Sequence, residues 1–152
     1  MLTLKKLAKK QMKHGGRLFD VIMMDPPWQL SSSQPSRGVA IGYSSLNDDL
    51  IADIPLGKLQ TSGFLFVWVI NAKYSWTINQ MDKWGYDLVD EIVWVKKTVN
   101  GKIAKGHGFY LQHAKETCLV GLKVCPKTHF LKFSKFNFLA FSNFFEFLTN
   151  FW

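Results

Sequence analysis

A short apolar run that ends abruptly in two prolines constrains the fold of this chain more than any other feature. Residues 19–24, which read Phe-Asp-Val-Ile-Met-Met, are followed at once by Asp25, Pro26, Pro27 and Trp28. Such a run predicts a buried strand, and the two prolines stiffen the loop after it. Polar chemistry directly after a buried parallel strand is typical of the crevice at the carboxyl end of an open α/β sheet. The alternative is an ordinary Pro-Pro turn with an incidental tryptophan.

The same four residues suit the recognition of an exocyclic amine on a base. The lone pair of such an amine is delocalised into the ring, so acceptors on its two N–H bonds are needed to aim that lone pair at a methyl donor. Asp25 supplies one acceptor, and the carbonyl of Pro26 can supply the other, because a proline peptide keeps its C=O. Trp28 offers a flat face on which an extruded base can stack, an interaction worth about 1–3 kcal/mol per base. This chemistry requires no metal.

Strand-like and helix-like segments alternate along the chain. Residues 3–14 predict a basic helix that ends at Gly15-Gly16, and residues 31–42 predict a long flexible loop of the kind that covers a substrate. A short helix capped by Asn47 or Asp48 is expected to end near Pro55.

Three further strands and a crossover helix complete this pattern. The strands are expected at 63–69, 86–96 and 117–124, and the helix at 72–83 with a stop at Gly85. The alternation predicts an α/β domain with a mostly parallel sheet and helices on its faces. Three tryptophans lie inside these elements or at their ends and are expected in the core: Trp68, Trp84 and Trp94.

Positive charge is concentrated in two blocks. The 152-residue chain has a formal net charge of +8 and 47% hydrophobic residues, which suits one domain with a core and a polyanionic partner. No acid lies between Glu91 and Glu116, and two blocks around a base pocket would suit a phosphate backbone. The alternative is a pair of solvated lysine-rich faces. The blocks consist of Lys5, Lys6, Lys9, Lys10, Lys13 and Arg17, and of Lys96, Lys97, Lys102, Lys105 and Lys115.

Cysteine and histidine give no sign of a metal site or of disulfides. The two cysteines, Cys118 and Cys125, have no partners at zinc spacing, and the four histidines are scattered. No secretory signal is visible, so buried free thiols in a reducing intracellular compartment are expected.

An ordered series of motifs resembles one family, the MT-A70 family of S-adenosylmethionine-dependent N6-adenine methyltransferases. The series comprises residues 25–28, Tyr43, and the segments 63–69 (Gly-Phe-Leu-Phe-Val-Trp-Val), 84–86 (Trp-Gly-Tyr), 89–96 (Val-Asp-Glu-Ile-Val-Trp-Val-Lys) and 113–121 (His-Ala-Lys-Glu-Thr-Cys-Leu-Val-Gly). Asp-Pro-Pro-Trp alone is shared with other amino-methyltransferases, whereas the ordered series is far more specific. Segments 29–38 and 99–110 resemble the DNA-directed branch of unicellular eukaryotes more than the messenger-RNA branch.

The resemblance implies a Rossmann-like methyltransferase fold with permuted motif order and a role for each matching residue. Asp25 and Pro26 would accept from the amine, Asp25 would also lie near the methionine part of S-adenosylmethionine, and Pro27 and Trp28 would shape the adenine slot. Tyr43 would lie on a mobile loop; for it, and for Glu116, an ordinary structural role is the alternative. The positions matching the base pocket are Tyr110, Gln112 and Glu116. The positions matching an interface with nucleic acid and a catalytically silent paralogous subunit are Lys96, Lys97, Lys102 and Lys105. A nuclear location and no membrane association are implied.

The resemblance is expected to stop after Val124, which divides the chain into 1–18, 19–125 and 126–152. Residues 127–152 hold most of the phenylalanines and show no clear period, a composition typical of a translated intron or shifted frame. A transmembrane or interfacial amphipathic helix is the alternative for this tail. The family's donor-binding segments would lie beyond the matched region, so the C-terminal half of the domain is expected to be incomplete and the isolated chain inactive. A non-catalytic nucleic-acid-binding or partner subunit, and a generic basic binding module, are the competing interpretations.

Overall fold

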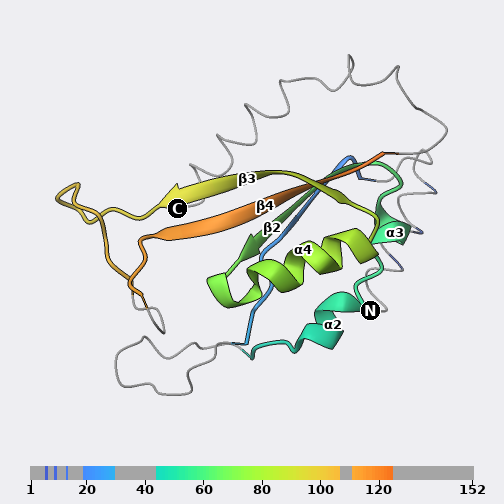
Figure 1. The fold of residues 1–152 in the computed structure, drawn as a ribbon. Coiled ribbons are helices and arrows are strands. Elements are labelled where there is room, and N and C mark those ends of the chain that lie inside the picture. Colours follow the sequence, from blue (N-terminus) through green and yellow to red (C-terminus); the bar gives the residue numbers. More distant parts are fainter. Residues whose placement is uncertain are drawn as a thin grey trace, which may run out of the picture.

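A four-stranded sheet forms the centre of the computed structural model, which describes residues 6, 9, 13, 19–29, 44–106 and 111–124. The strands are β1 (Val21–Met24), β2 (Gly63–Val69), β3 (Asp87–Val95) and β4 (Lys115–Lys123), in the order β1-β2-β4-β3 (Figure 1). β1 and β2 pair in parallel, whereas β4 is antiparallel to both β2 and β3. The α/β class is therefore confirmed.

The expectation of a mostly parallel sheet is wrong for the described strands, because only one of the three pairings is parallel. The first three strands do run in one direction, since helices separate β1 from β2 and β2 from β3. β3 and β4 are joined instead by residues 96–114, which we call the arm and in which no described residue is helical. Without a crossover helix β4 returns antiparallel and inserts between β2 and β3.

Short helices follow the signals expected for their ends. In α2 (Asp48–Ala52) the side chain of Asn47 accepts a hydrogen bond from the Leu50 N–H at 3.1 Å, which confirms Asn47 as the cap. A helix not predicted, α3 (Leu56–Leu59), follows Pro55. The crossover helix consists of a 3₁₀ turn, η2 (Asn71–Lys73), and α4 (Tyr74–Lys83), and it ends before Gly85, whose φ is 81°.

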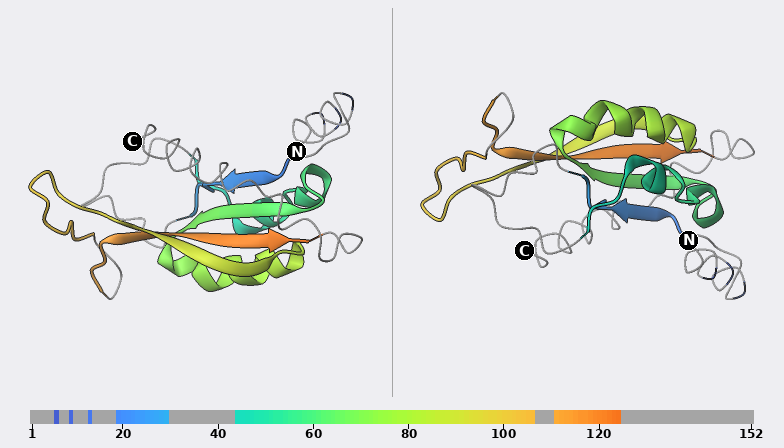
Figure 2. Two further views of the ribbon diagram at one scale, coloured as in Figure 1. Left: turned by 90° about the horizontal axis from the view of Figure 1, so that it is seen from above. Right: turned by 90° about the horizontal axis from the view of Figure 1, so that it is seen from below.

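The two faces of the sheet carry separate apolar clusters. The helices share one face, because Ile51 of α2, Leu56 of α3 and Met81 of α4 belong to one cluster with Leu65 and Leu119 of the strands. α4 runs along the sheet on this face (Figure 2). The other face carries a smaller cluster of Phe66, Cys118 and Val120, with Trp68 and Ile92 packed against it. We call this second face the open face.

Several expected elements lie outside the described residues. Of residues 3–14 the structure describes Lys6, Lys9 and Lys13, which are helical and exposed. The loop at 31–42 and the tail at 126–152 are not described, so their interpretations stay predictions. Within the described part of the chain, no helix has the length and apolar character needed to cross a bilayer.

We predict that Gly63→Ala destabilises the fold by at least about 2 kcal/mol. Gly63 has a φ of 139°, and a Cβ there would lie 2.0 Å from the Asp20 carbonyl oxygen, which accepts a hydrogen bond from Phe64. Urea denaturation measures the change. Gly57→Ala is the control, since its Cβ would meet only the Lys123 ammonium at 4.0 Å. Equal stability of the two variants would contradict this account of the start of β2.

Candidate active site

The loop after β1 is fixed to the sheet through the indole of Trp28. Its Nε1–H donates to the backbone carbonyl of Trp68 at 2.9 Å, at the end of β2. Its ring meets that of Trp76 on α4 edge to face, with centroids 5.7 Å apart. Trp28 is 7% exposed and belongs to the core cluster on the helical face. The Asp-Pro-Pro-Trp corner is therefore held by β2 and α4 together.

The two proline carbonyls of the corner each accept a backbone hydrogen bond. The Trp28 N–H donates to the Pro26 carbonyl at 2.8 Å, which closes a tight turn, and the Leu46 N–H donates to the Pro27 carbonyl at 2.9 Å. A carbonyl oxygen has two lone pairs. Pro26 is a buried residue whose carbonyl keeps one lone pair, and the amine-binding hypothesis requires a second donor to reach it.

Asp25 lies at the carboxyl end of β1 and is exposed. Within the described part of the chain, no group forms a hydrogen bond or ion pair with its carboxylate. Partial desolvation, and secondarily the negative charge of Glu116, raise the pKa of Asp25 above its ordinary value of 3.8. A carboxylate held without a partner beside another carboxylate has acceptor capacity to offer a ligand.

Glu116 joins this corner from β4, more than 80 residues further along the chain. It is partly buried and forms an ion pair at 2.5 Å with Lys96, the first residue of the arm. Glu116 stands opposite Trp94 in the β3–β4 ladder, so both side chains lie on the same face of the sheet. The pairs Trp68–Cys118 and Cys118–Ile92 identify this face as the open face.

The structure partly separates the residues that the sequence grouped together. Glu116 lies near Asp25, as expected of a pocket residue, but it is paired with Lys96, which had been assigned to the interface. Gln112 is exposed in the arm. Tyr43 and Tyr110 lie outside the described residues, and their roles stay predictions.

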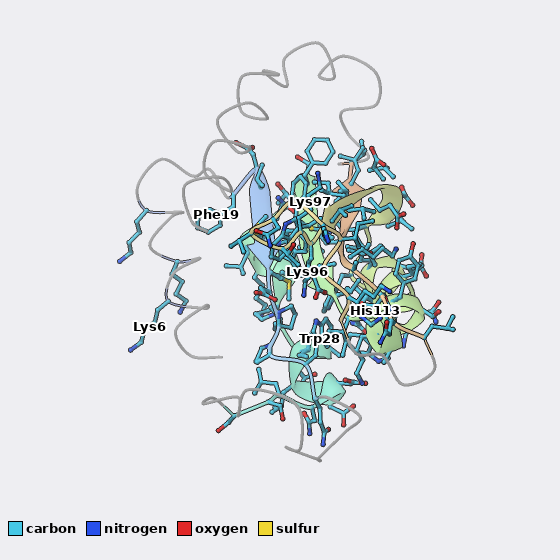
Figure 3. All side chains as sticks on the ribbon, turned by 90° about the vertical axis from the view of Figure 1, so that its left-hand side faces the viewer. Lys6, Phe19, Trp28, Lys96, Lys97 and His113 are labelled. Atoms are coloured by element: carbon cyan, nitrogen blue, oxygen red, sulfur yellow. The ribbon has the colours of Figure 1, made fainter. Side chains whose placement is uncertain are left out.

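The remaining interface lysines lie on the arm. Lys97, Lys102 and Lys105 are exposed, and a bridge between Lys97 and Ile103 keeps the arm folded back on itself. Asn100-Gly101 makes the expected turn, with Gly101 at a φ of 72°. Figure 3 looks onto this end of the molecule, where Lys96 and Lys97 lie together, whereas Lys6 of the N-terminal basic block lies well apart from them.

The exposure of Trp28 and of Trp94 differs from what the sequence predicts. Trp28 was expected to present an open face for stacking, but its indole is buried because it binds β2 and α4. Trp94 was expected in the core, yet it is 43% exposed, because β3 is the edge strand of the described sheet and is exposed along almost its whole length. Trp68 and Trp84 do pack against the two clusters.

Within the described residues no group of His, Cys, Asp or Glu could hold a metal ion. Cys118 is a buried free thiol, as expected, and burial raises its pKa to about 12. A thiol of that kind is not a nucleophile near neutral pH. The chemistry of this site therefore rests on carboxylates, carbonyls and indoles.

The fold and the corner define the class of this chain. An α/β sheet whose first strand ends in Asp-Pro-Pro-Trp beside a second carboxylate is a methyltransferase-like arrangement, and the profile of the MT-A70 family matches residues 19–142. The chain belongs to the MT-A70 family. The match runs past Val124, where the sequence analysis placed the end of the resemblance.

Curated relatives agree with this assignment. The chain is 39% identical over 111 residues to the "N(6)-adenosine-methyltransferase subunit METTL3" of Danio rerio, covering 72% of this chain and 18% of that protein. It is 35% identical over 113 residues to a "Putative N(6)-adenosine-methyltransferase MT-A70-like" of Medicago truncatula, covering 73% and 17%. It is 34% identical over 91 residues to the "N(6)-adenine-specific methyltransferase METTL4" of Mus musculus, covering 57% and 18%. The chain thus spans less than a fifth of the length of these relatives.

We predict that Glu116→Gln lowers the pKa of Asp25, whereas Lys96→Gln raises it. The first change removes a nearby negative charge, and the second leaves that charge without its cation. Carboxyl ¹³C NMR across an acid titration measures both shifts. Glu91→Gln is the control, because Glu91 is engaged by Tyr74 on the helical face and should leave Asp25 unchanged. Shifts of the same sign in the two test variants would contradict the proposed coupling.

Proposed function

We propose that this chain contributes the amine-binding part of an N6-adenine methyltransferase site acting on nucleic acid. The observation that carries this proposal is the Asp25 carboxylate at the end of β1, unpaired within the described part of the chain and beside a Pro26 carbonyl with one acceptor position left. Two such acceptors can hold the two N–H bonds of adenine and orient the nitrogen lone pair. Positioning of this kind can supply a large part of a catalytic rate enhancement.

The corner also suits S-adenosylmethionine as the methyl donor. When bound, this cofactor would supply an electrophilic methyl group and leave as a neutral thioether, and the proton lost by the methylated amine would pass to water. Asp25 has two carboxylate oxygens, so one can accept from the amine and the other from the ammonium group of the methionine part. Pro27 and Trp28 shape the adenine slot in this proposal, with Trp28 acting from below as a buried support.

The proposed substrate is adenine in nucleic acid, and the choice between DNA and RNA belongs to the proposal. Segments 29–38 and 99–110 resemble the DNA-directed branch of the family, whereas the METTL3 relatives are named for adenosine, which is a ribonucleoside. Both sugars are therefore compared directly in the experiment below. A nucleic-acid substrate is also the ground for proposing a nuclear location.

The arm is proposed to contact both nucleic acid and a second, catalytically silent paralogous subunit. The Danio rerio relative is named a subunit, and the arm carries three apolar side chains with high exposure: Val99 at 104%, Ile103 at 63% and Leu111 at 80%. Exposed apolar groups on a projecting element are typical of protein interfaces. The arm lysines between them suit phosphates.

We predict that Asp25→Asn and Asp25→Glu each reduce methyl transfer by at least about 10²-fold, the scale expected when a reacting group is misplaced by about 1 Å. The protein, tagged at its own locus and purified from its own cells with any bound partners, is assayed with labelled S-adenosylmethionine. DNA and RNA oligonucleotides of one sequence are the acceptors. Asp82→Asn on the exposed surface of α4 is the control. Unchanged transfer in both Asp25 variants would remove Asp25 from the mechanism, and binding without transfer by the unmodified protein would favour a non-catalytic subunit.

We predict that Ile103→Asp releases the partner subunit without unfolding the chain. The side chain is exposed in the arm, so a charge is tolerated in the free chain and disfavoured in an apolar contact. Quantitative mass spectrometry of the co-purified proteins measures the loss. Leu50→Asp is the control, because Leu50 is an apolar residue of α2 that is 54% exposed, against 63% for Ile103. Partner retention equal to that of Leu50→Asp would exclude this part of the arm from the interface.

A further inference from the structure

Trp94 is 43% exposed and lies near the carboxyl end of β3, at the same end of the strands as Asp25 and Glu116. The register pairs Trp94 with Glu116, which places both on the open face. The Lys96 ammonium lies 5.6 Å from the centre of the Trp94 ring and also pairs with Glu116. An aromatic face beside cations is the combination with which proteins bind single-stranded nucleic acid.

The distance across the sheet separates this indole from the amine-binding corner. β1 and β3 are separated by β2 and β4, and adjacent strands lie about 4.8 Å apart, so the two sites are about 14 Å apart along the sheet. A purine held with its amine at Asp25 does not span that distance. A base that stacks on Trp94 is therefore a neighbour of the target adenine.

The charges around Trp94 indicate a polyanionic occupant. Within the sequence no acid lies between Glu91 and Glu116, and the exposed Lys97, Lys102 and Lys105 follow Trp94 along the arm. A second protein chain would find apolar side chains on the arm, but at Trp94 it would have to cover the Lys96 ammonium. Phosphates of a single strand would be attracted to those lysines while a base covers the indole.

We infer that Trp94, together with Lys96 and the arm lysines, forms a subsite for the nucleotide that flanks the target adenine, and this inference rests on the proposed function. Stacking on an indole tolerates every base, so the subsite contributes affinity and strand placement more than sequence preference.

The test measures binding of the chain to fluorescent single-stranded oligonucleotides by anisotropy, over a range of salt concentrations. Trp94→Ala is expected to weaken binding roughly tenfold, with an unchanged slope of affinity against salt, whereas Trp94→Phe keeps most of the affinity. Lys97→Gln is expected to reduce the salt slope by about one contact. Val95→Ala is the matched control, because Val95 is 49% exposed on the same strand but points to the opposite face. Thermal melting verifies that each variant is folded.

Three outcomes separate this inference from the proposed function. Oligonucleotide binding that is equal in Trp94→Ala and Val95→Ala overturns the subsite, even where methyl transfer is intact. Loss of affinity for free adenosine in Trp94→Ala overturns the flanking assignment, because the indole then contacts the target base. Trp94-dependent oligonucleotide binding in a protein that transfers no methyl group supports the subsite while the proposed function fails.

Discussion

The hydrogen bond from the Trp28 indole to the Trp68 carbonyl is the contact on which the arrangement of the site depends. A loop with two prolines has few backbone donors of its own, so its position must come from side chains. The indole supplies this by joining the end of β1 to the end of β2 and by packing against Trp76 of α4. Because the indole is almost fully buried, the corner moves only if part of the core moves. Asp25 is thereby held at a defined place on the sheet edge, which is what orienting an amine requires.

The insertion of β4 between β2 and β3 then brings distant residues to that edge. β4 begins where β2 ends, so Glu116 enters the sheet beside the corner. The last residues of β3 are aligned with the first residues of β4, which places Trp94 opposite Glu116 at the same end of the sheet. If β4 were instead a parallel strand at the edge of the sheet, Glu116 and Trp94 would lie at opposite ends of the sheet. The antiparallel strand therefore creates the second half of the site.

Local signals in the sequence were sufficient to predict the elements but not their partners. Asn47 caps α2 and Gly85 follows α4, because capping and left-handed backbone depend on one or two residues. The prediction of the Asp-Pro-Pro-Trp corner after β1 was also correct, because it depends only on a short apolar run that is followed by two prolines. By contrast, the burial of Trp28 and the exposure of Trp94 depend on which strand lies at the edge. The composition of residues 87–95 predicts a strand but not its place in the sheet, and only the strand order shows that β3 lies at the edge. The sequence did not predict the ion pair between Lys96 and Glu116 for the same reason, because its members lie 20 positions apart in the chain.

The electrostatics of the edge argue that the corner is adapted to a ligand more than to stability. The pKa of Asp25 is raised in the fold, so its ionised form is less favourable there than in the unfolded chain. This destabilisation is complete at neutral pH and is relieved only as the pH falls below the raised pKa towards the ordinary value of 3.8. An unpaired carboxylate kept near Glu116 therefore opposes folding, and Lys96 offsets only the Glu116 charge. A donor such as an amine or ammonium group at Asp25 would supply the missing hydrogen bonds, so the free energy lost in folding is recovered on binding.

Lys96 contacts both Glu116 and Trp94, so occupation of the flanking subsite and the charge beside Asp25 depend on one side chain.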